Sequence, residues 1–204
     1  MSTLFTPRHS WLHLGDRHIE AARWDGTIKV AKFNPETVRQ VQHDLNNGVE
    51  PIWEDFVRHE VQPDSWTDEH HNQLVTVGLN LLTQLFEGAG GNAFNHSNAI
   101  VGVGSSSTAW TAADVHLGGD GSSASAYYQQ ADTGYPTQSN GVITCYCTFG
   151  SGNANFAWNE WCLADGTSIT GGSTLSTVAT GVVMINHKIA SLGTKSSGAS
   201  WTAH

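Results

Sequence analysis

The chain has 204 residues, of which 39% are hydrophobic and only 13% are charged, about half the usual charged share of a soluble domain. The formal net charge is −9 and Lys and Arg do not cluster, which argues against a surface that binds nucleic acid by neutralising phosphates. No stretch approaches the roughly 20 apolar residues of a membrane span, and the first residues lack the apolar core of a signal peptide. We therefore expect a soluble protein made in the cytoplasm, with neither nucleic acid nor a membrane as its partner.

Charge divides the chain into two regions. Residues 1–70 contain 12 Asp or Glu and 7 Lys or Arg, whereas residues 71–204 contain only 6 and 2. Strands so poor in charge are prone to associate edge to edge. Either neighbouring subunits cover them, or their many Ser, Thr, Asn and Gly residues keep the surface soluble.

We expect residues 1–70 to form an N-terminal attachment region of short elements rather than a compact core. Asn34 followed by Pro35 is typical of a helix start and predicts a helix near 35–46. Strands are expected at 27–33 and 56–61. The region contains half of the eight tryptophans, which either anchor a partner or close small local cores. These interface candidates are Trp11, Trp24, Trp53 and Trp66.

The second region predicts a helix followed by strands. Apolar residues recur at helical spacing over 74–86, and glycines from Gly88 onward end the helix. The alternation and the density of turns in the rest predict a mainly β fold, a β-sandwich or jelly-roll-like module over 71–204 with one or two helices. The expected strands are 99–103, 126–130, 142–149, 155–163, 181–189 and 199–203.

The residues that could carry chemistry do not form a known catalytic pattern. Cys145, Cys147 and Cys162 lack a fourth metal ligand, so small buried apolar roles are favoured over a metal site. Glu160, which lies between two tryptophans, is either an acid with a shifted pKa in a sugar cleft or a partly buried carboxylate bonded to a loop amide, and we favour the second. We expect no enzyme activity and no cofactor.

Five segments of the second region resemble, in order, a structural module of tailed-bacteriophage particles. The resemblance covers residues 71–203, about two-thirds of the chain, and departs from the pattern at Cys162 and His187. Proteins with this module are described as tail-fibre, minor tail or head-decoration proteins. The matching segments are 71–78 (HNQLVTVG), 99–109 (AIVGVGSSSTA), 111–117 (TAADVHL), 148–161 (TFGSGNANFAWNEW) and 184–201 (MINHK to GTK and W).

The motif residues have simple structural interpretations. We expect Gly102 and Gly104 to let a strand turn, and Asp114 to cap the turn at 115–117. Glu160 and Lys195 are expected to form a rare charge pair inside a domain with few charges.

The resemblance implies a virion structural protein that binds the major capsid protein or tail proteins and associates with itself. A capsid decoration or minor capsid protein is our leading expectation, and a tail or tail-fibre component is the alternative. Carbohydrate binding through exposed aromatic residues is a further expectation, although such residues also fill sandwich cores. The candidates for stacking on sugars are Trp110, Tyr127, Tyr128 and Tyr135.

Overall fold

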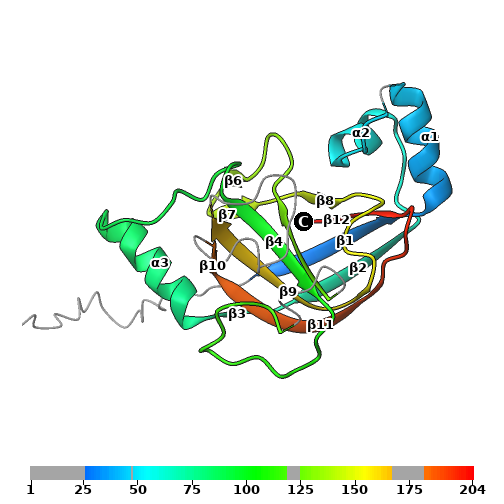
Figure 1. The fold of residues 1–204 in the computed structure, drawn as a ribbon. Helices are drawn as coiled ribbons and strands as arrows, with labels where there is room; N and C mark the ends of the chain where they lie inside the picture. Colours follow the sequence, from blue (N-terminus) through cyan, green and yellow to red (C-terminus); the bar gives the residue numbers. More distant parts are fainter. Residues whose placement is uncertain (1–25, 47, 119–124, 167–181) are drawn as a thin grey trace, which may run out of the picture.

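The computed structural model describes residues 26–46, 48–118, 125–166 and 182–204, so the interface candidates Trp11 and Trp24 lie outside the described residues. The fold is mainly β, as predicted, and three helices accompany the strands in the described part of the chain (Figure 1). None of these helices has the length and hydrophobicity that a membrane crossing requires.

The first sheet has four antiparallel strands and joins the two ends of the described chain. Its order is β2 (Ser65–His70), β1 (Thr27–Phe33), β12 (Ser200–Ala203) and β8 (Cys147–Phe149). Because β1 lies between β2 and β12, residues 27–70 complete the sandwich. The predicted boundary at residue 70 therefore does not separate two structural units in the described part of the chain, whereas the attachment role of residues 1–70 stays a prediction.

The second sheet is built around the long strand β9 (Ala157–Gly166), which pairs with three other strands. The order is β3 (Gln73–Leu74), β11 (Asn186–Thr194), β9, β4 (Ala99–Gly104) and β5 (Ala126–Gln130), and β10 (Val182–Met184) also pairs with β9. A separate hairpin joins β6 (Thr137–Ser139) to β7 (Val142–Thr144).

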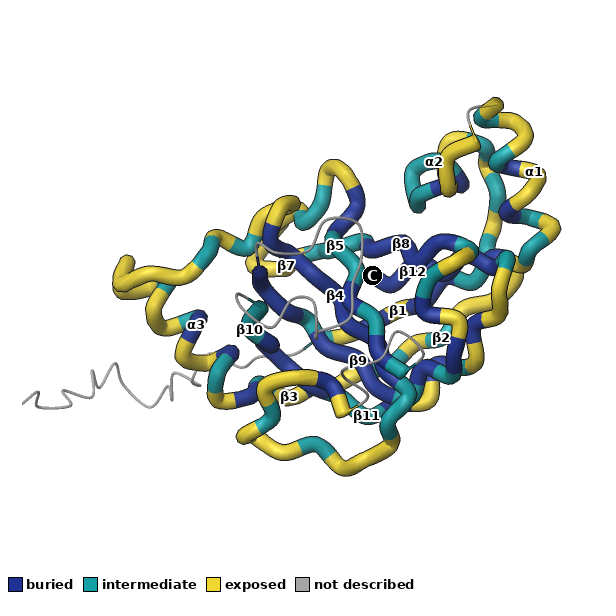
Figure 2. The backbone as a smooth tube through the Cα atoms, in the orientation of Figure 1, coloured by how far each residue is buried: buried dark blue, intermediate teal, exposed yellow. Residues whose placement is uncertain are grey.

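The two sheets enclose an aromatic core. Phe149 and Trp201 of the first sheet both pack edge-on against Trp158 of the second, with ring centroids 4.7 and 4.8 Å apart. The Trp158 indole donates a hydrogen bond of 2.9 Å to the Ala154 carbonyl, so this buried ring has no unmet donor. The central strands are accordingly the most buried part of the chain (Figure 2).

Two smaller apolar clusters cover the outer faces of the sheets. On the first sheet, Val38 and Val41 of helix α1 (Pro35–Leu45) pack with Ala31, Phe33 and Phe56. On the second sheet, the cluster consists of Val75, Ile100, Leu117, Ala126, Tyr128, Cys162, Ala164 and Met184.

The predicted helices begin and end for the expected reasons. Asn34 caps α1, since its side chain accepts hydrogen bonds from the Glu36 and Thr37 amides. Helix α3 (Thr76–Glu87) ends at Gly88, which has the left-handed φ of 66° that favours glycine.

The predicted strand 181–189 is divided at Ile185 into β10 and β11. Two further predicted strands differ from the structure. The segment 56–61 is not a strand, because helix α2 (Trp53–Arg58) occupies it and stacks Phe56 on Phe33 at 3.7 Å. The segment 142–149 is divided into β7 and β8, which belong to different sheets. In both places contacts with distant strands outweigh the local pattern.

Gly102 and Gly104 do not turn a strand, contrary to our expectation. Both lie inside β4, where the close approach of other side chains requires the absence of a Cβ atom. A Cβ atom at Gly102 would lie 2.7 Å from both the Cys162 sulfur and a ring carbon of Tyr128, and one at Gly104 would meet the Glu160 carboxylate.

We expect Gly102→Ala to lower the free energy of unfolding by at least about 1 kcal/mol, because the added methyl overpacks a buried contact. Gly152→Ala is the matched control, since nothing lies within 4 Å of a Cβ atom there. Urea denaturation of the two variants measures the difference. Equal midpoints would show that the sheet adjusts to the methyl group without strain.

Candidate functional site

The most distinctive surface is a group of five rings on the outer face of the first sheet, here called the aromatic cluster. The rings of Tyr146 and His204 are stacked, with centroids 4.7 Å apart and planes at 3°. Tyr146 also contacts Trp53 at 5.1 Å and Tyr135 at 4.5 Å. Trp66 completes the cluster, 6.0 Å from Trp53 and 5.8 Å from His204.

The strands below the aromatic cluster present small residues. Strand register places Ala31 opposite both Trp66 and Thr202, and Thr202 opposite Thr148. The two threonine hydroxyls lie 3.0 Å apart and are hydrogen bonded. This row of short side chains leaves room for the Trp53 ring, which comes from the first residue of α2.

A buried carboxyl group fixes the start of α2 on the sheet. Asp132 accepts hydrogen bonds from the Thr148 amide at 2.9 Å and the Thr148 hydroxyl at 2.6 Å, and a longer one of 3.5 Å from the Trp53 amide. Burial raises the pKa of Asp132 to about 6 despite these hydrogen bonds, and the nearby charge of Glu54 adds to the rise.

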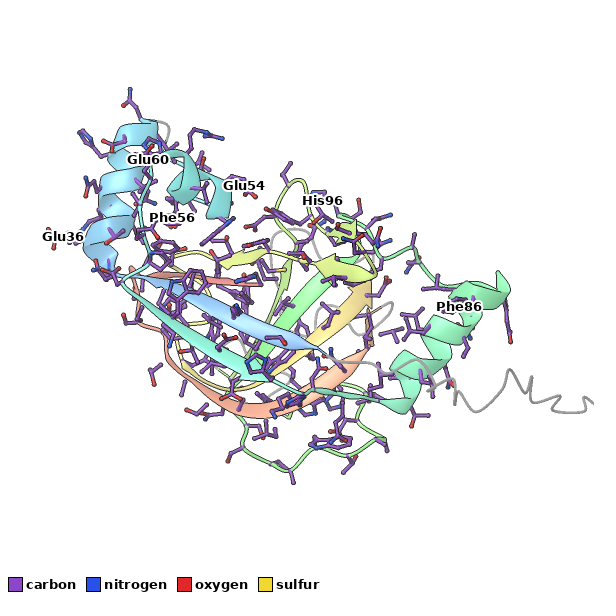
Figure 3. All side chains as sticks on the ribbon, turned by 180° about the vertical axis from the view of Figure 1, so that it is seen from behind. Glu36, Glu54, Phe56, Glu60, Phe86 and His96 are labelled. Carbon is purple, nitrogen blue, oxygen red and sulfur yellow. The ribbon has the colours of Figure 1, made fainter. Side chains whose placement is uncertain are left out.

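Glu54 connects α2 to the cis Tyr135–Pro136 turn. The Tyr135 hydroxyl donates a hydrogen bond to the Glu54 carboxylate, and burial together with the charge of Glu54 raises the pKa of Tyr135 to about 12. Glu54 and Phe56 both lie on α2, at the corner of the molecule that α1 and α2 occupy (Figure 3).

The aromatic cluster is open to solvent at Trp66, whose relative exposure is 49%. A groove of about 220 Å³ runs beside this ring and is lined by Lys29, Trp66, Thr67, Asp68 and His204. Lys29 and Asp68 form an exposed ion pair of 3.7 Å. Burial, reinforced by the charge of Lys29, lowers the pKa of His204, so this ring is uncharged at pH 7 and stacks as a flat apolar surface.

A second polar site lies on the other sheet, where Glu160 and His187 are buried and Asp114 is partly exposed. His187 of β11 bridges two acidic residues, with Nδ1 2.8 Å from Asp114 and Nε2 3.0 Å from Glu160. Glu160 is 0% exposed and also accepts from the Gly118 amide at 2.9 Å and the Ser106 amide at 3.3 Å. The expected bonding of the Glu160 carboxylate to a loop amide is therefore confirmed, although the residue is completely rather than partly buried.

The predicted pair of Glu160 with Lys195 is wrong. The Lys195 ammonium instead donates to the Gly150 and Asn153 carbonyls and the Asn155 side chain, at 2.8 to 2.9 Å. Burial lowers the pKa of Lys195 to about 8, although the nearby charge of Glu50 opposes this shift. Lys195 thus holds the 150–155 loop in place.

Asp114 does not cap the turn at 115–117. Its carboxylate accepts from the Thr111 amide at 2.9 Å and the Thr111 hydroxyl at 2.7 Å, and it faces His187. Burial alone would raise the pKa of Asp114, but the hydrogen bonds from Thr111 and His187 outweigh it and lower the pKa overall.

The three cysteines are not brought together. The sulfur atoms of Cys145 and Cys147 lie 3.7 Å apart near the core between the sheets, whereas Cys162 packs in the cluster on the outer face of the second sheet. Within the ranges that the structure describes, no group of three or more His, Cys, Asp or Glu side chains is arranged to hold a metal ion.

The four residues expected to stack on sugars do not form one platform. Tyr128 is only 1% exposed and its hydroxyl accepts from the Leu117 amide, which contradicts its proposed role. Tyr127 packs edge-on against Phe149, and Trp110 lies in the loop after β4. Tyr135 alone joins the aromatic cluster.

Sequence reasoning found two of the five rings as interface candidates, Trp53 and Trp66, and a third, Tyr135, as a candidate for stacking on sugars. It missed Tyr146 and His204. Strand alternation places Tyr146 on the face opposite to that of Cys145 and Cys147, so a sequence signal was present for it. The position of His204 instead depends on the pairing of β12 with β1. Comparisons of the chain with protein-family models, curated proteins and solved structures return no match.

Proposed function

We propose that this chain is a structural protein of a tailed-bacteriophage particle and that it binds another particle protein through the aromatic cluster. The favoured role is a capsid decoration or minor capsid protein that binds the major capsid protein, in the virion. The alternative is a tail or tail-fibre component. In neither role does the chain act as an enzyme.

The half-exposed Trp66 ring, held over a sheet by other rings, is the observation that carries the proposal. Rigid aromatic residues contribute strongly to protein interfaces, because they bury a large area at low cost in side-chain entropy. Trp66, Trp53 and His204 present such a surface, and the Lys29–Asp68 pair at its edge provides a polar rim. The resemblance of residues 71–203 to phage structural modules supports the choice of partner.

The test has two parts. Mass spectrometry of particles purified from the phage that encodes this chain is expected to detect it, and gold labelling is expected to place it on the head rather than the tail. A gold label found only on the tail would contradict the capsid role and support the tail or tail-fibre role. Absence from complete particles would overturn both roles.

We expect Trp66→Ala to weaken binding of the purified protein to particles that lack it by about thirtyfold, the effect of losing an interface hot spot. Trp66 is half exposed, so the variant is expected to fold. Trp110→Ala is the matched control, because Trp110 lies in the loop after β4 and outside the aromatic cluster. Equal binding by Trp66→Ala and wild type would remove the aromatic cluster from the interface.

The groove beside Trp66 also favours a second candidate, carbohydrate binding. An aromatic ring flanked by an amine and a carboxylate can stack on a sugar and bond to its hydroxyl groups. A glycan array distinguishes the two functions, since sugar binding predicts a signal that Trp66→Ala abolishes. An array without signal would leave protein binding alone.

A further inference from the structure

A pocket of about 440 Å³ opens between the two sheets, in the size range of small-molecule sites. Its walls come from β1 of the first sheet, from β4 and β9 of the second, from helix α3 and from the β7 strand of the hairpin. The apolar lining includes Ile28, Leu81, Leu85, Phe94, Val101 and Leu163.

Two polar atoms at this wall are buried without a hydrogen-bond partner in the described parts of the chain. They are the indole Nε1 of Trp161, a residue that is 4% exposed, and Oδ2 of Asp165, a residue that is 1% exposed. Buried donors and acceptors are almost always satisfied, so each such atom requires an explanation. Here the two lie on residues that line the same pocket.

The positions of the two groups define an elongated site. Trp161, Leu163 and Asp165 alternate along β9 and share the face that lines the pocket. Asp165 lies four positions after Trp161 on the strand, which places the two residues about 13 Å apart. A ligand that fits this site therefore has an apolar stretch that lies along Leu163. It also has either an oxygen that accepts from the Trp161 N–H or a hydroxyl group that donates to the Asp165 oxygen.

The surroundings favour an uncharged ligand over a fatty acid. An anionic head group would meet the carboxyl group of Asp165, and the lysine at the wall, Lys29, is engaged with Asp68. A hydroxyl group suits both ends of the pocket, because it donates to a carboxylate and accepts from an indole N–H.

Two exposed apolar side chains are part of the pocket lining. Val142 and Ile143 of β7 line the pocket and are 62% and 54% exposed. Phe86, 92% exposed, lies near the end of the lining helix α3 (Figure 3). An apolar molecule that enters past Val142 and Ile143 would contact apolar side chains.

We propose that this pocket binds an uncharged, elongated apolar molecule with a hydroxyl group, such as a medium-chain alcohol, with the hydroxyl at Trp161 or Asp165. The pocket shares Lys29 and His204 with the groove beside Trp66. The proposed contacts are made by Trp161 and Asp165, which lie outside the aromatic cluster, so the inference does not depend on the virion role. Loss of particle binding through Trp66 and loss of alcohol binding are therefore distinguishable results.

The test is a titration of the full-length protein with 1-decanol, followed by the indole N–H signals in a nitrogen–proton NMR spectrum. Trp161→Phe assigns the signal of that indole. We expect it to move downfield in a saturable manner, as an N–H does when it gains an acceptor. Decane, which has no oxygen, is expected to bind about tenfold more weakly or without that shift.

Ile143→Trp provides the blocking variant, since Ile143 is more than half exposed and the larger ring would obstruct the pocket without disturbing the core. We expect it to abolish the decanol shift, whereas Val57→Trp, an equally exposed position on α2, leaves it unchanged. The proposal is overturned if decanol does not bind, if Ile143→Trp binds it normally, or if all eight indoles shift alike.

Discussion

Replacing His187 with leucine is expected to lower the free energy of unfolding by about 3–5 kcal/mol, the cost of breaking a buried ionic network by removing one partner. The imidazole of His187 separates Glu160, which is fully buried, from Asp114. Without the imidazole, two carboxyl groups face each other across an apolar side chain. Urea denaturation at pH 6 measures the loss.

The pH dependence identifies the cause. Burial lowers the pKa of His187, but its hydrogen bonds to Glu160 and Asp114 outweigh burial and raise the pKa above 6.5 overall. A raised pKa means that the bridge contributes its full stability below pH 6.5 and loses it as the pH rises through the folded-state pKa. The free energy of unfolding of His187→Leu is expected not to fall in this way as the pH rises.

Two controls test whether the effect belongs to the buried bridge. His43→Leu removes a histidine whose side chain is 89% exposed, and it is expected to change stability by less than about 0.5 kcal/mol. The double variant His187→Leu/Glu160→Leu removes the stranded carboxylate and is expected to recover part of the loss. If the double variant is less stable than His187→Leu, packing rather than charge explains the effect.

Much of the local structure was predictable because local interactions determine it. The strand at 27–33 and the strand at 126–130 match the structure residue for residue, and Asn34 caps α1 as expected. Strand alternation and a side-chain cap are both read within a few residues of sequence. The mainly β class follows from the same signals.

The sites were less predictable, because they depend on which strands pair. Glu160 lies on β9 and His187 on the neighbouring β11, while Asp114 comes from a loop, 73 positions of sequence away from His187. In a region with few charges, the sequence predicts that Lys195 pairs with Glu160. No sequence pattern reveals that the Lys195 ammonium donates instead to neutral carbonyl groups. Only the strand register distinguishes these arrangements.

The aromatic cluster illustrates the same limit. Tryptophan enrichment identified Trp53 and Trp66, but the segment after Trp53 was predicted as a strand, which would have carried the ring elsewhere. Packing of Phe56 on Phe33 makes that segment helical and brings Trp53 over the sheet. A contact between residues 23 positions apart thus determines the local conformation, as tertiary packing often does.

Asp132→Asn is expected to stabilise the protein at pH 7.5 by about 2–3 kcal/mol, although it removes a hydrogen-bonded carboxylate. The folded-state pKa of Asp132 is about 6, against an ordinary value of 3.8. Its contribution to stability is therefore fully present below pH 3.8 and lost as the pH rises through about 6. Asparagine resembles the protonated acid, so the variant keeps the contacts with Thr148 and avoids the buried charge.

Urea denaturation of both proteins between pH 4 and 8 measures this effect, and the two curves are expected to converge toward pH 4. Asp68→Asn is the matched control, because Asp68 borders the same surface but forms an exposed ion pair with Lys29. Its effect is expected to stay below about 1 kcal/mol.

The result also tests how Trp53 is held in the aromatic cluster. An asparagine NH₂ group cannot accept the 3.5 Å hydrogen bond from the Trp53 amide, whereas the Thr148 hydroxyl still accepts one from it at 3.2 Å. If Asp132→Asn is less stable than wild type at pH 7.5, the carboxylate holds the start of α2 more strongly than burial disfavours its charge. If the variant is more stable, the threonine and the stacked rings are sufficient to fix Trp53, and the aromatic cluster keeps its shape without a buried charge.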